Sequence, residues 1–357
     1  MGRFINQRFK ALEAYTPGEQ PRDMQYVKLN TNESPFPPSK GVLEAVSEIE
    51  VSKLNLYPDP TCKELKAAIA EYYSVGLENV FVSNGSDDIL NFFFMAFCDS
   101  VEHEVKFPSI SYGFYKVYAE LHGVKYTLVP LNDDFSIDIN DYMGNDANIV
   151  IANPNAPTGI ALSRKDVEKI LCKNKDKLVL IDEAYVDFGA ESCIELTKKY
   201  DNLIVVCTYS KSRSMAGARL GFAIANEELI SDLEKIKYST NPYNINRLTM
   251  VAGIEAIKDA EYYTDNCKTI IENREYTSRM LEEMGFSTTP SKANFIFAKS
   301  NKIGGEELYL KLKSRGVLVR HFSSADICEY NRITVGTKEQ MDKLITEVRN
   351  ILKEKEC

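Results

Sequence analysis

Three short runs of almost uninterrupted apolar residues constrain the fold of this chain more than any other feature. They cover Asn148–Ala152, Leu178–Ile181 and Leu203–Cys207. None of them alternates between apolar and polar side chains, as a strand with one face in water does. Strands that are covered on both faces have this pattern, and such strands are typical of parallel sheets.

The segments around these runs alternate between strand and helix patterns. Alternation of this kind predicts an α/β domain with a mostly parallel sheet flanked by helices. In such a sheet, ligands bind at the carboxyl ends of the strands. Further strands are expected at Asn79–Ser83, Glu104–Phe107 and Gly221–Ala225, and helices at Ser86–Phe97, Ser163–Cys172 and from a capping box at Thr61–Glu64 to Gly76.

The two ends of the chain differ from this middle part. Prolines 35, 37 and 38 forbid a helix near the N-terminus, which predicts an extended arm. After about Pro242, long amphipathic helices and strands at Asn294–Ala298 and Arg332–Val335 predict a smaller α+β domain. We therefore expect an arm with part of the small domain at 1–40, a large domain at 41–241 and a small domain at 242–357.

Composition excludes several classes of function. The 357 residues carry a net charge of -9, which argues against nucleic acid or an anionic membrane as partner. The longest apolar stretch, Ile89–Cys98, is too short to span a bilayer. Eight cysteines without a C-x-x-C pair and three scattered histidines predict reduced thiols, no metal site and a cytoplasmic protein.

Two acidic residues, Asp182 and Glu183, follow one apolar run directly. A Walker B strand has this pattern, but the chain lacks the G-x-x-x-x-G-K-[ST] partner that an ATPase needs. It also lacks G-x-G-x-x-G for a dinucleotide and G-x-S-x-G for a hydrolase. Asp182 is either a functional carboxylate at a strand end or a cap of the next turn.

A lysine, Lys211, follows another apolar run and is preceded by Ser210. Small residues then lead to Arg219, which permits close approach of the backbone. A lysine in such a place can act as an amine nucleophile, although most lysines are solvated surface charges.

Two turns complete the set of candidate sites. The turn at 153–159 contains two prolines and a glycine and could aim Asn155, or be an ordinary turn. Gly85 and Ser86 join a strand to a helix start, where backbone N–H groups bind anions, unless Ser86 is simply an N-cap.

In this order, the candidate residues resemble a pyridoxal phosphate site. The chain resembles the fold type I aminotransferases of the aspartate aminotransferase superfamily, and among them the histidinol-phosphate aminotransferases. The similarity extends from Tyr15 to Thr337. It rests on Leu29-Asn-Thr-Asn-Glu-Ser-Pro, Tyr57-Pro-Asp, Asn153-Pro-Asn-Ala-Pro-Thr-Gly, Asp182-Glu-Ala-Tyr-Val-Asp-Phe, Ser210-Lys-Ser through Arg219, Pro242-Tyr-Asn-Ile-Asn and Arg332-Ile-Thr-Val-Gly-Thr. Ala156 and Arg213-Ser-Met depart from the common pattern.

The resemblance implies a role for each residue near the cofactor. Lys211 would carry pyridoxal phosphate covalently and shuttle the proton, and Asp182 would keep the pyridine nitrogen protonated. Asn155 and Tyr185 would hydrogen-bond the phenolic oxygen, and Tyr112 would stack on the ring. The residues expected to hold the phosphate are Gly85, Ser86, Asp87, Ser210 and Arg219.

The resemblance also implies substrates and an assembly. Arg332 would bind the substrate anion, a phosphate or a carboxylate, with Arg320, Tyr15, Asn30 and Asn155 beside it. Tyr57 would reach the phosphate of the other subunit in a homodimer. The expected reaction transfers the amino group of histidinol phosphate to 2-oxoglutarate in histidine biosynthesis. An aromatic amino acid aminotransferase, a threonine-phosphate decarboxylase and a non-catalytic regulator of the same fold are the alternatives.

Overall fold

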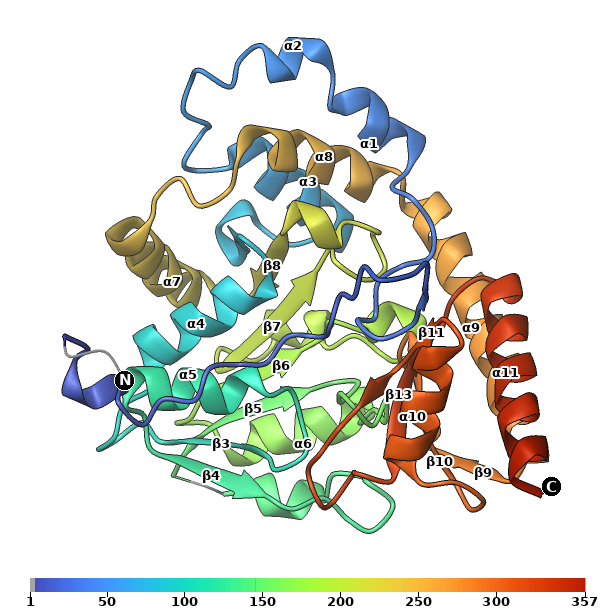
Figure 1. The fold of residues 1–357 in the computed structure, drawn as a ribbon. Coiled ribbons are helices and arrows are strands. Elements are labelled where there is room, and N and C mark those ends of the chain that lie inside the picture. The colour runs from blue at the N-terminus through green and yellow to red at the C-terminus, as the bar shows by residue number, and fades with distance from the viewer. Residues whose placement is uncertain (1–3, 145, 357) are drawn as a thin grey trace.

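The computed structural model describes residues 4–144 and 146–356. A seven-stranded sheet forms the centre of the larger part of the molecule (Figure 1). All neighbouring strands are parallel except β8, which is antiparallel to both of its neighbours. The order across the sheet is β2 (Val80–Ser83), β8 (Gly221–Ile224), β7 (Leu203–Thr208), β6 (Val179–Asp182), β5 (Asn148–Ala152), β3 (Val105–Pro108) and β4 (Tyr126–Val129).

Helices cover both faces of this sheet, which confirms the predicted α/β layers. Within β6, Val179 and Ile181 pack into one hydrophobic core and Leu180 into the other, so the uninterrupted apolar run is buried on both sides. One face carries α4 (Ser86–Phe97), α5 (Phe114–His122) and α7 (Glu227–Thr240), and the other carries α3 (Lys63–Tyr73), α6 (Arg164–Lys173) and α8 (Arg247–Lys258).

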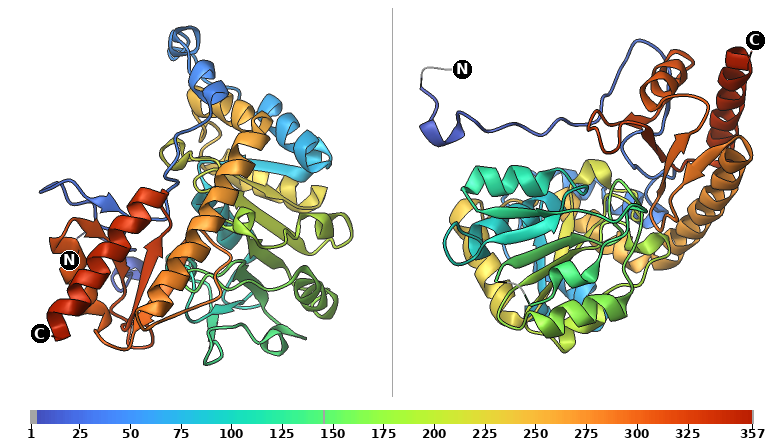
Figure 2. Two further views of the ribbon diagram at one scale, coloured as in Figure 1. Left: turned by 90° about the vertical axis from the view of Figure 1, so that its right-hand side faces the viewer. Right: turned by 90° about the horizontal axis from the view of Figure 1, so that it is seen from below.

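A second, smaller sheet lies beside the first with long helices on its outer side (Figure 2). Its four strands are antiparallel, in the order β12 (Arg320–His321), β13 (Tyr330–Thr334), β10 (Phe295–Ser300) and β9 (Phe286–Thr288). The helices are α9 (Ala260–Glu283), α10 (Gly305–Ser314) and α11 (Lys338–Glu356).

The N-terminal segment joins this smaller part. Strand β1 (Val27–Lys28) pairs in parallel with β11 (Val317–Leu318), and an extended arm before it crosses the front of the large sheet (Figure 1). Short helices α1 (Lys40–Ala45) and α2 (Glu48–Val51) follow. Isolated 3-10 turns lie at Gln7–Phe9, Leu77–Asn79, Ile139–Tyr142, Val186–Phe188, Ile194–Lys198 and Ala216–Ala218.

The predicted domain boundary at 242 lies between two helices that pack with the large sheet. Helix α8 packs against α1 and α3 and contributes Ala252 and Ala256 to the core beneath the sheet. The domain limits themselves stay a prediction. No helix in the described ranges is long and apolar enough to cross a membrane.

Two details of the sequence analysis were wrong. The helix after Thr61 is not opened by a capping box, because Asp59 accepts hydrogen bonds from the backbone of Thr61 and Lys63 instead. The same helix ends at Ser74 in the left-handed conformation, before Gly76. A capping box does form at the start of α11, where Gln340 Oε1 accepts from Thr337 N at 2.9 Å and Thr337 Oγ1 accepts from Gln340 N at 3.4 Å.

Candidate active site

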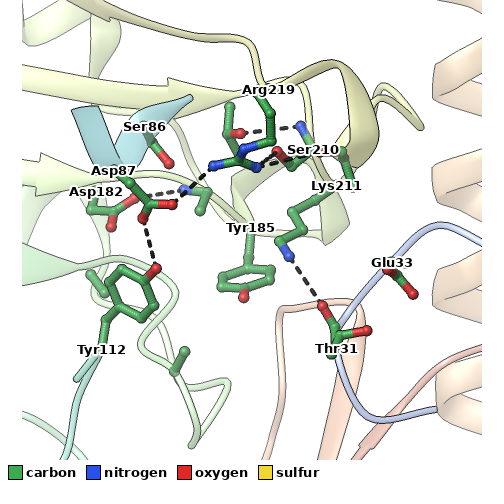
Figure 3. Close-up of a pocket in the computed structure, with 15 residues that line it drawn as sticks. Thr31, Glu33, Ser86, Asp87, Tyr112, Asp182, Tyr185, Ser210, Lys211 and Arg219 are labelled. Atoms are coloured by element: carbon green, nitrogen blue, oxygen red, sulfur yellow. Dashed lines mark hydrogen bonds and ion pairs between the residues drawn. The ribbon is translucent and has the colours of Figure 1, made fainter. Parts of the chain in front are cut away.

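A cavity of about 270 Å³ opens at the carboxyl ends of the large sheet (Figure 3). Strands β6 and β7 end there, and β8 begins there because it runs the opposite way. Residues far apart in sequence thus meet at one edge, as the strand-end pattern predicted. Among the cavity-lining residues are eight of the predicted site residues, namely Ser86, Asp87, Tyr112, Asp182, Tyr185, Ser210, Lys211 and Arg219.

Asp182, the last residue of β6, is 5% exposed and lines the cavity floor. Its Oδ2 accepts a hydrogen bond from the Tyr115 hydroxyl at 2.8 Å, and its Oδ1 accepts one from Ala184 N at 3.2 Å. Burial raises the pKa of Asp182 to about 6, although both hydrogen bonds oppose the shift. Asp182 does cap the following turn, but an ionised carboxylate so buried also favours a cationic partner in the cavity.

Lys211 extends into the same cavity from the loop after β7 (Figure 3). Its Nζ donates to Thr31 O at 3.3 Å and lies 5.8 Å from the centre of the Tyr185 ring. The Tyr185 hydroxyl accepts from Asn32 Nδ2 at 3.0 Å. Within the described residues, the amine donates one long hydrogen bond, to a neutral carbonyl, so it is held weakly and could react with a bound carbonyl compound.

The start of α4 is shaped to receive an anion. Gly85 has φ +86°, and a Cβ there would lie 2.7 Å from Arg219 Nη2. A Cβ on Gly221 would lie 2.4 Å from the backbone nitrogen of Ser86. Glycine at both positions lets the turn, the helix start and the guanidinium meet. The N–H groups of a first helical turn have no partners within the helix and its dipole favours anions, and Ser86 and Asp87 of this turn line the cavity. Gly85, not Ser86, occupies the N-cap.

Asp87 is bonded to two other residues of this anion site. Its Oδ1 accepts from the Tyr112 hydroxyl at 2.7 Å, and its Oδ2 pairs with Arg219 Nη2 at 3.0 Å. Arg219 Nη1 also donates to Ser210 Oγ at 3.4 Å. The carboxylate thus orients both the aromatic ring and the guanidinium beside the helix start.

Asn155 lies behind the cavity wall, and its side chain is fully engaged. Its Oδ1 accepts from Ser111 Oγ at 2.7 Å, and its Nδ2 donates to Ile110 O at 2.9 Å and Thr158 Oγ1 at 3.2 Å. Ala156, next to it, lines the cavity. The predicted aim of Asn155 toward a bound ring requires one of these bonds to exchange.

A second cavity of about 400 Å³ adjoins the first and shares Tyr112, Tyr185 and Lys211 with it. Arg332 Nη2 donates to Asn30 O at 3.0 Å, while its Nε is buried without a partner in the described part of the chain. Burial lowers the pKa of Arg332. A guanidinium with an unused donor fits an anionic ligand. The predicted substrate residues that line this cavity are Tyr15, Asn30, Arg320 and Arg332.

Tyr57 is the predicted site residue that stands apart. It is 79% exposed, stacks on Tyr243 with ring centres 4.6 Å apart and does not line either cavity. Within one chain it does not reach the anion site.

Sequence reasoning missed three residues around the site. Tyr115 holds Asp182, and Ser212 Oγ donates to Asp187 Oδ2 at 2.5 Å, which ties the Lys211 loop to the Tyr185 loop. Arg213 lies between the rings of Tyr72 and Tyr263 and donates to Ala256 O at 2.9 Å. The only sequence signal was the unusual arginine after the lysine.

The family model for aminotransferase class I and II matches residues 24–348. The chain belongs to this aminotransferase family. It is 53% identical to the histidinol-phosphate aminotransferase of Brachyspira hyodysenteriae over 354 residues, covering 99% of this chain and 100% of the relative. The relative of the same name in Clostridium acetobutylicum is 46% identical over 352 residues, again covering 99% and 100%.

Solved structures of similar fold agree with the family. The histidinol-phosphate aminotransferase of Sinorhizobium meliloti in complex with pyridoxal 5'-phosphate has a TM-score of 0.84 at 23% identity, covering 92% of each chain. The one of Clostridium acetobutylicum has a TM-score of 0.82 at 24% identity, covering 92% of this chain and 99% of the other. This likeness confirms the predicted fold of the aminotransferase.

Enzymes of this family depend on pyridoxal 5'-phosphate. The residues of this aminotransferase fit that group by three observations. Asp182 is a buried carboxylate that makes no ion pair within the described residues, Lys211 is weakly held, and glycines at 85 and 221 leave an anion cradle that a Cβ would fill. The predicted cofactor is therefore consistent with the site.

Proposed function

We propose that this aminotransferase exchanges the amino group between histidinol phosphate and 2-oxoglutarate, giving imidazole acetol phosphate and glutamate, within histidine biosynthesis. The observation that carries the proposal is the second cavity, where Arg332 and Arg320 stand beside Tyr15 next to Lys211. The names of relatives that are 53% and 46% identical over nearly the full chain support the same substrate.

Pyridoxal phosphate, when bound, supplies an electron sink for the bond that breaks at the amino carbon. Asp182 would hold a proton on the ring nitrogen, and its burial makes that pairing strong. Lys211 Nζ would take the proton from the amino carbon of the substrate and deliver it to the reacting carbon of the cofactor. Tyr112 and Tyr185 would keep the ring in place, and Ser86, Ser210 and Arg219 would hold the phosphate.

Histidinol phosphate carries a phosphate-bearing carbon where glutamate carries the carboxylate next to its amino carbon, and one arginine would serve both groups. A guanidinium can donate two parallel hydrogen bonds to either a carboxylate or a phosphate. Arg332 would bind the carboxylate of glutamate or the phosphate of histidinol phosphate. The larger charge of a phosphate needs more donors, which Arg320 and Tyr15 would add, with Asn30 and Asn155 behind them.

We also propose that the enzyme is a homodimer in which Tyr57 completes the anion site of the other subunit. The support is an apolar surface around α1 and α2, which we call the α1–α2 surface. Exposed apolar patches of this kind usually mark an interface. It comprises Leu43 (63% exposed), Ile49 (68%), Leu54 (54%), Leu56 (57%) and Tyr57 (79%). The cytoplasmic location stays a prediction from the sequence.

A screen of amino donors tests the substrate. The purified enzyme with bound cofactor is mixed with histidinol phosphate, glutamate, phenylalanine or threonine phosphate, and the change in cofactor absorbance is followed. We expect histidinol phosphate to react with the highest kcat/KM. Faster reaction with phenylalanine would establish the aromatic alternative, and release of carbon dioxide from threonine phosphate would establish the decarboxylase. Lys211→Ala is the control, because it retains the cavity without the amine.

A further inference from the structure

The N-terminal arm carries one predicted substrate residue, Tyr15, on a segment without regular structure (Figure 2). Within the described ranges, residues 13–26 make no backbone-to-backbone hydrogen bond. Side-chain contacts must therefore decide where Tyr15 lies. On the large-domain side, the Tyr15 ring stacks on Phe114 with centres 4.2 Å apart.

On the small-domain side, Glu19 fastens the arm to α10. Its Oε1 accepts a hydrogen bond from the Tyr309 hydroxyl and its Oε2 one from Lys313 Nζ, two residues one helical turn apart. Its carbonyl oxygen also accepts from Asn30 Nδ2 at 2.8 Å. Burial works to raise the pKa of Glu19, but the bonds from Lys313 and Tyr309 outweigh it and lower the pKa.

The segment between these two anchors lies tightly against the substrate cavity. A Cβ on Gly18 would lie 2.6 Å from Thr31 Cγ2, so a larger residue would require the Thr31 side chain or the arm to shift. Arg320 donates to Thr16 O at 3.3 Å and to Pro17 O at 3.4 Å. Both bonds are long and go to neutral carbonyls.

An anion in the cavity would compete with these contacts for Arg320. Charge-assisted bonds from a guanidinium to phosphate are shorter and stronger than bonds to a carbonyl. A phosphate beside Arg332 would therefore draw Arg320 away from Thr16 and Pro17. The arm would then lose its hydrogen bonds to Arg320 while Tyr15 contacts the phosphate. The bonds of Glu19 to Tyr309 and Lys313 would still hold the arm in place.

We propose that Glu19 is a positioning residue for the phosphate end of the substrate, acting by fixing the arm to α10 through Tyr309 and Lys313 while Arg320 turns to the substrate. This role rests on the proposed function. It concerns recognition of the phosphorylated substrate, because the smaller carboxylate of glutamate is held by Arg332 without Arg320 or Tyr15.

The test compares Glu19→Gln and Lys313→Met with the wild-type holoenzyme in each half-reaction, by stopped-flow absorbance of the cofactor. Because the pair is about one-third exposed, its charge contribution is reduced by solvent. We expect KM for histidinol phosphate to rise roughly three- to thirtyfold, with kcat and both glutamate parameters within about twofold. The double variant should be no worse than the worse single variant.

Limited trypsin digestion gives a readout that does not depend on turnover. Lys10 and Arg22 lie in the exposed arm. We expect cleavage there to be faster in Glu19→Gln than in the wild type, both with and without histidinol phosphate. Glu354→Gln is the matched control, since it removes the exposed pair with Arg315 in the same part of the molecule, at 2.5 Å, away from the arm. It should change neither kinetics nor cleavage.

The outcomes separate the role from the proposed substrate. An unchanged KM for histidinol phosphate in Glu19→Gln, or equal losses in both half-reactions, overturns the role of Glu19 alone. Arm cleavage at the wild-type rate does the same. A wild type that does not use histidinol phosphate overturns the proposed substrate and, with it, this role.

Discussion

The hydroxyl of Tyr115 donates a hydrogen bond of 2.8 Å to Oδ2 of Asp182, and Tyr115 is fully buried in α5. Helix α5 and strand β6 are thus joined, through residues 67 positions apart, beside the first cavity, which Asp182 lines. The bond stabilises the charged carboxylate against the burial that raises its pKa. The pKa of Asp182 is therefore about 6, so its carboxyl group changes charge near that pH.

Removal of this hydroxyl should make cofactor binding more dependent on pH. In Tyr115→Phe, the pKa of Asp182 rises above about 6, so less of it is ionised at pH values just above 6. A lost bond to a charged group is worth about 1.5–3 kcal/mol, so we expect affinity for pyridoxal phosphate to fall roughly tenfold near pH 6.5. The loss should shrink by pH 8.5.

Absorbance titration of the cofactor-free protein at both pH values measures this effect. Tyr118→Phe is the control, because it removes another hydroxyl from α5 that does not contact Asp182. A loss of the same size at both pH values would show that Tyr115 acts through packing and not through the charge of Asp182.

Replacing Asp182 itself should separate binding from turnover. Asp182→Asn removes the charge at every pH but retains the anion cradle, so we expect cofactor affinity to fall only modestly, by roughly tenfold, while kcat falls at least about a hundredfold. Glu183→Gln is the matched control, because Glu183 faces away from the cavity and accepts from Ser192 Oγ at 2.6 Å. Near-normal turnover in Asp182→Asn would reduce Asp182 to a turn cap.

The stability of the cofactor-free protein should fall as pH rises from about 4 to 7. Burial raises the pKa of Asp182 to about 6 and that of Glu183 to about 7. Between the unfolded and folded pKa values, the folded state binds more protons than the unfolded state, so the free energy of unfolding decreases with pH. Each group contributes on the order of 3 kcal/mol to this decrease.

Urea denaturation between pH 4.5 and 8 checks the sign. The decrease should be smaller in Glu183→Gln and in Asp182→Asn than in the wild type. Equal slopes in all three proteins would mean that neither carboxyl group carries a raised pKa.

Replacing each of the two arginines of the second cavity should affect the two substrates differently. Arg320→Ala removes charge-assisted bonds to phosphate worth about 1.5–3 kcal/mol, so kcat/KM for histidinol phosphate should fall roughly ten- to a hundredfold. Glutamate should be affected less, whereas Arg332→Ala should damage both half-reactions. Equal damage to both half-reactions by Arg320→Ala would exclude a phosphate-specific role.

The proposed dimer depends on the α1–α2 surface. Ile49→Glu places a charge on that surface, so we expect the variant to sediment as a monomer at low micromolar concentration. Its activity, assayed at the same concentration, should be reduced. Val101→Glu is the control, because Val101 is 79% exposed outside that surface. An active wild-type monomer would contradict the composite site and the role of Tyr57.

Much of the fold was predictable because the composition of individual segments indicates which strands are buried on both faces. The runs at Asn148–Ala152 and Leu203–Thr208 are buried on both faces, and their composition alone indicates this. The edge strand β4 was missed, since Thr127 and Leu128 are exposed and its pattern is not that of a buried strand.

The candidate site was predictable where residues follow strands, as Asp182 and Lys211 do. The contacts of Tyr115 with Asp182 and of Glu19 with α10 were not, because they join segments 67 and 290 residues apart. No local pattern marks either contact. The capping box predicted at Thr61 was wrong for a local reason, because Asp59 accepts hydrogen bonds from the backbone N–H groups of Thr61 and Lys63.

The reversed direction of β8 constrains how this chain can vary in length. Because β7 and β8 are antiparallel, the loop between them leaves and re-enters the sheet at one edge and carries both Lys211 and Arg219. One inserted residue there would shift one of the two charges relative to the other. Connections at the opposite edge, such as 98–104 and 173–178, carry no such pair. Alignment gaps among homologues should therefore gather at that opposite edge and be absent from 209–220.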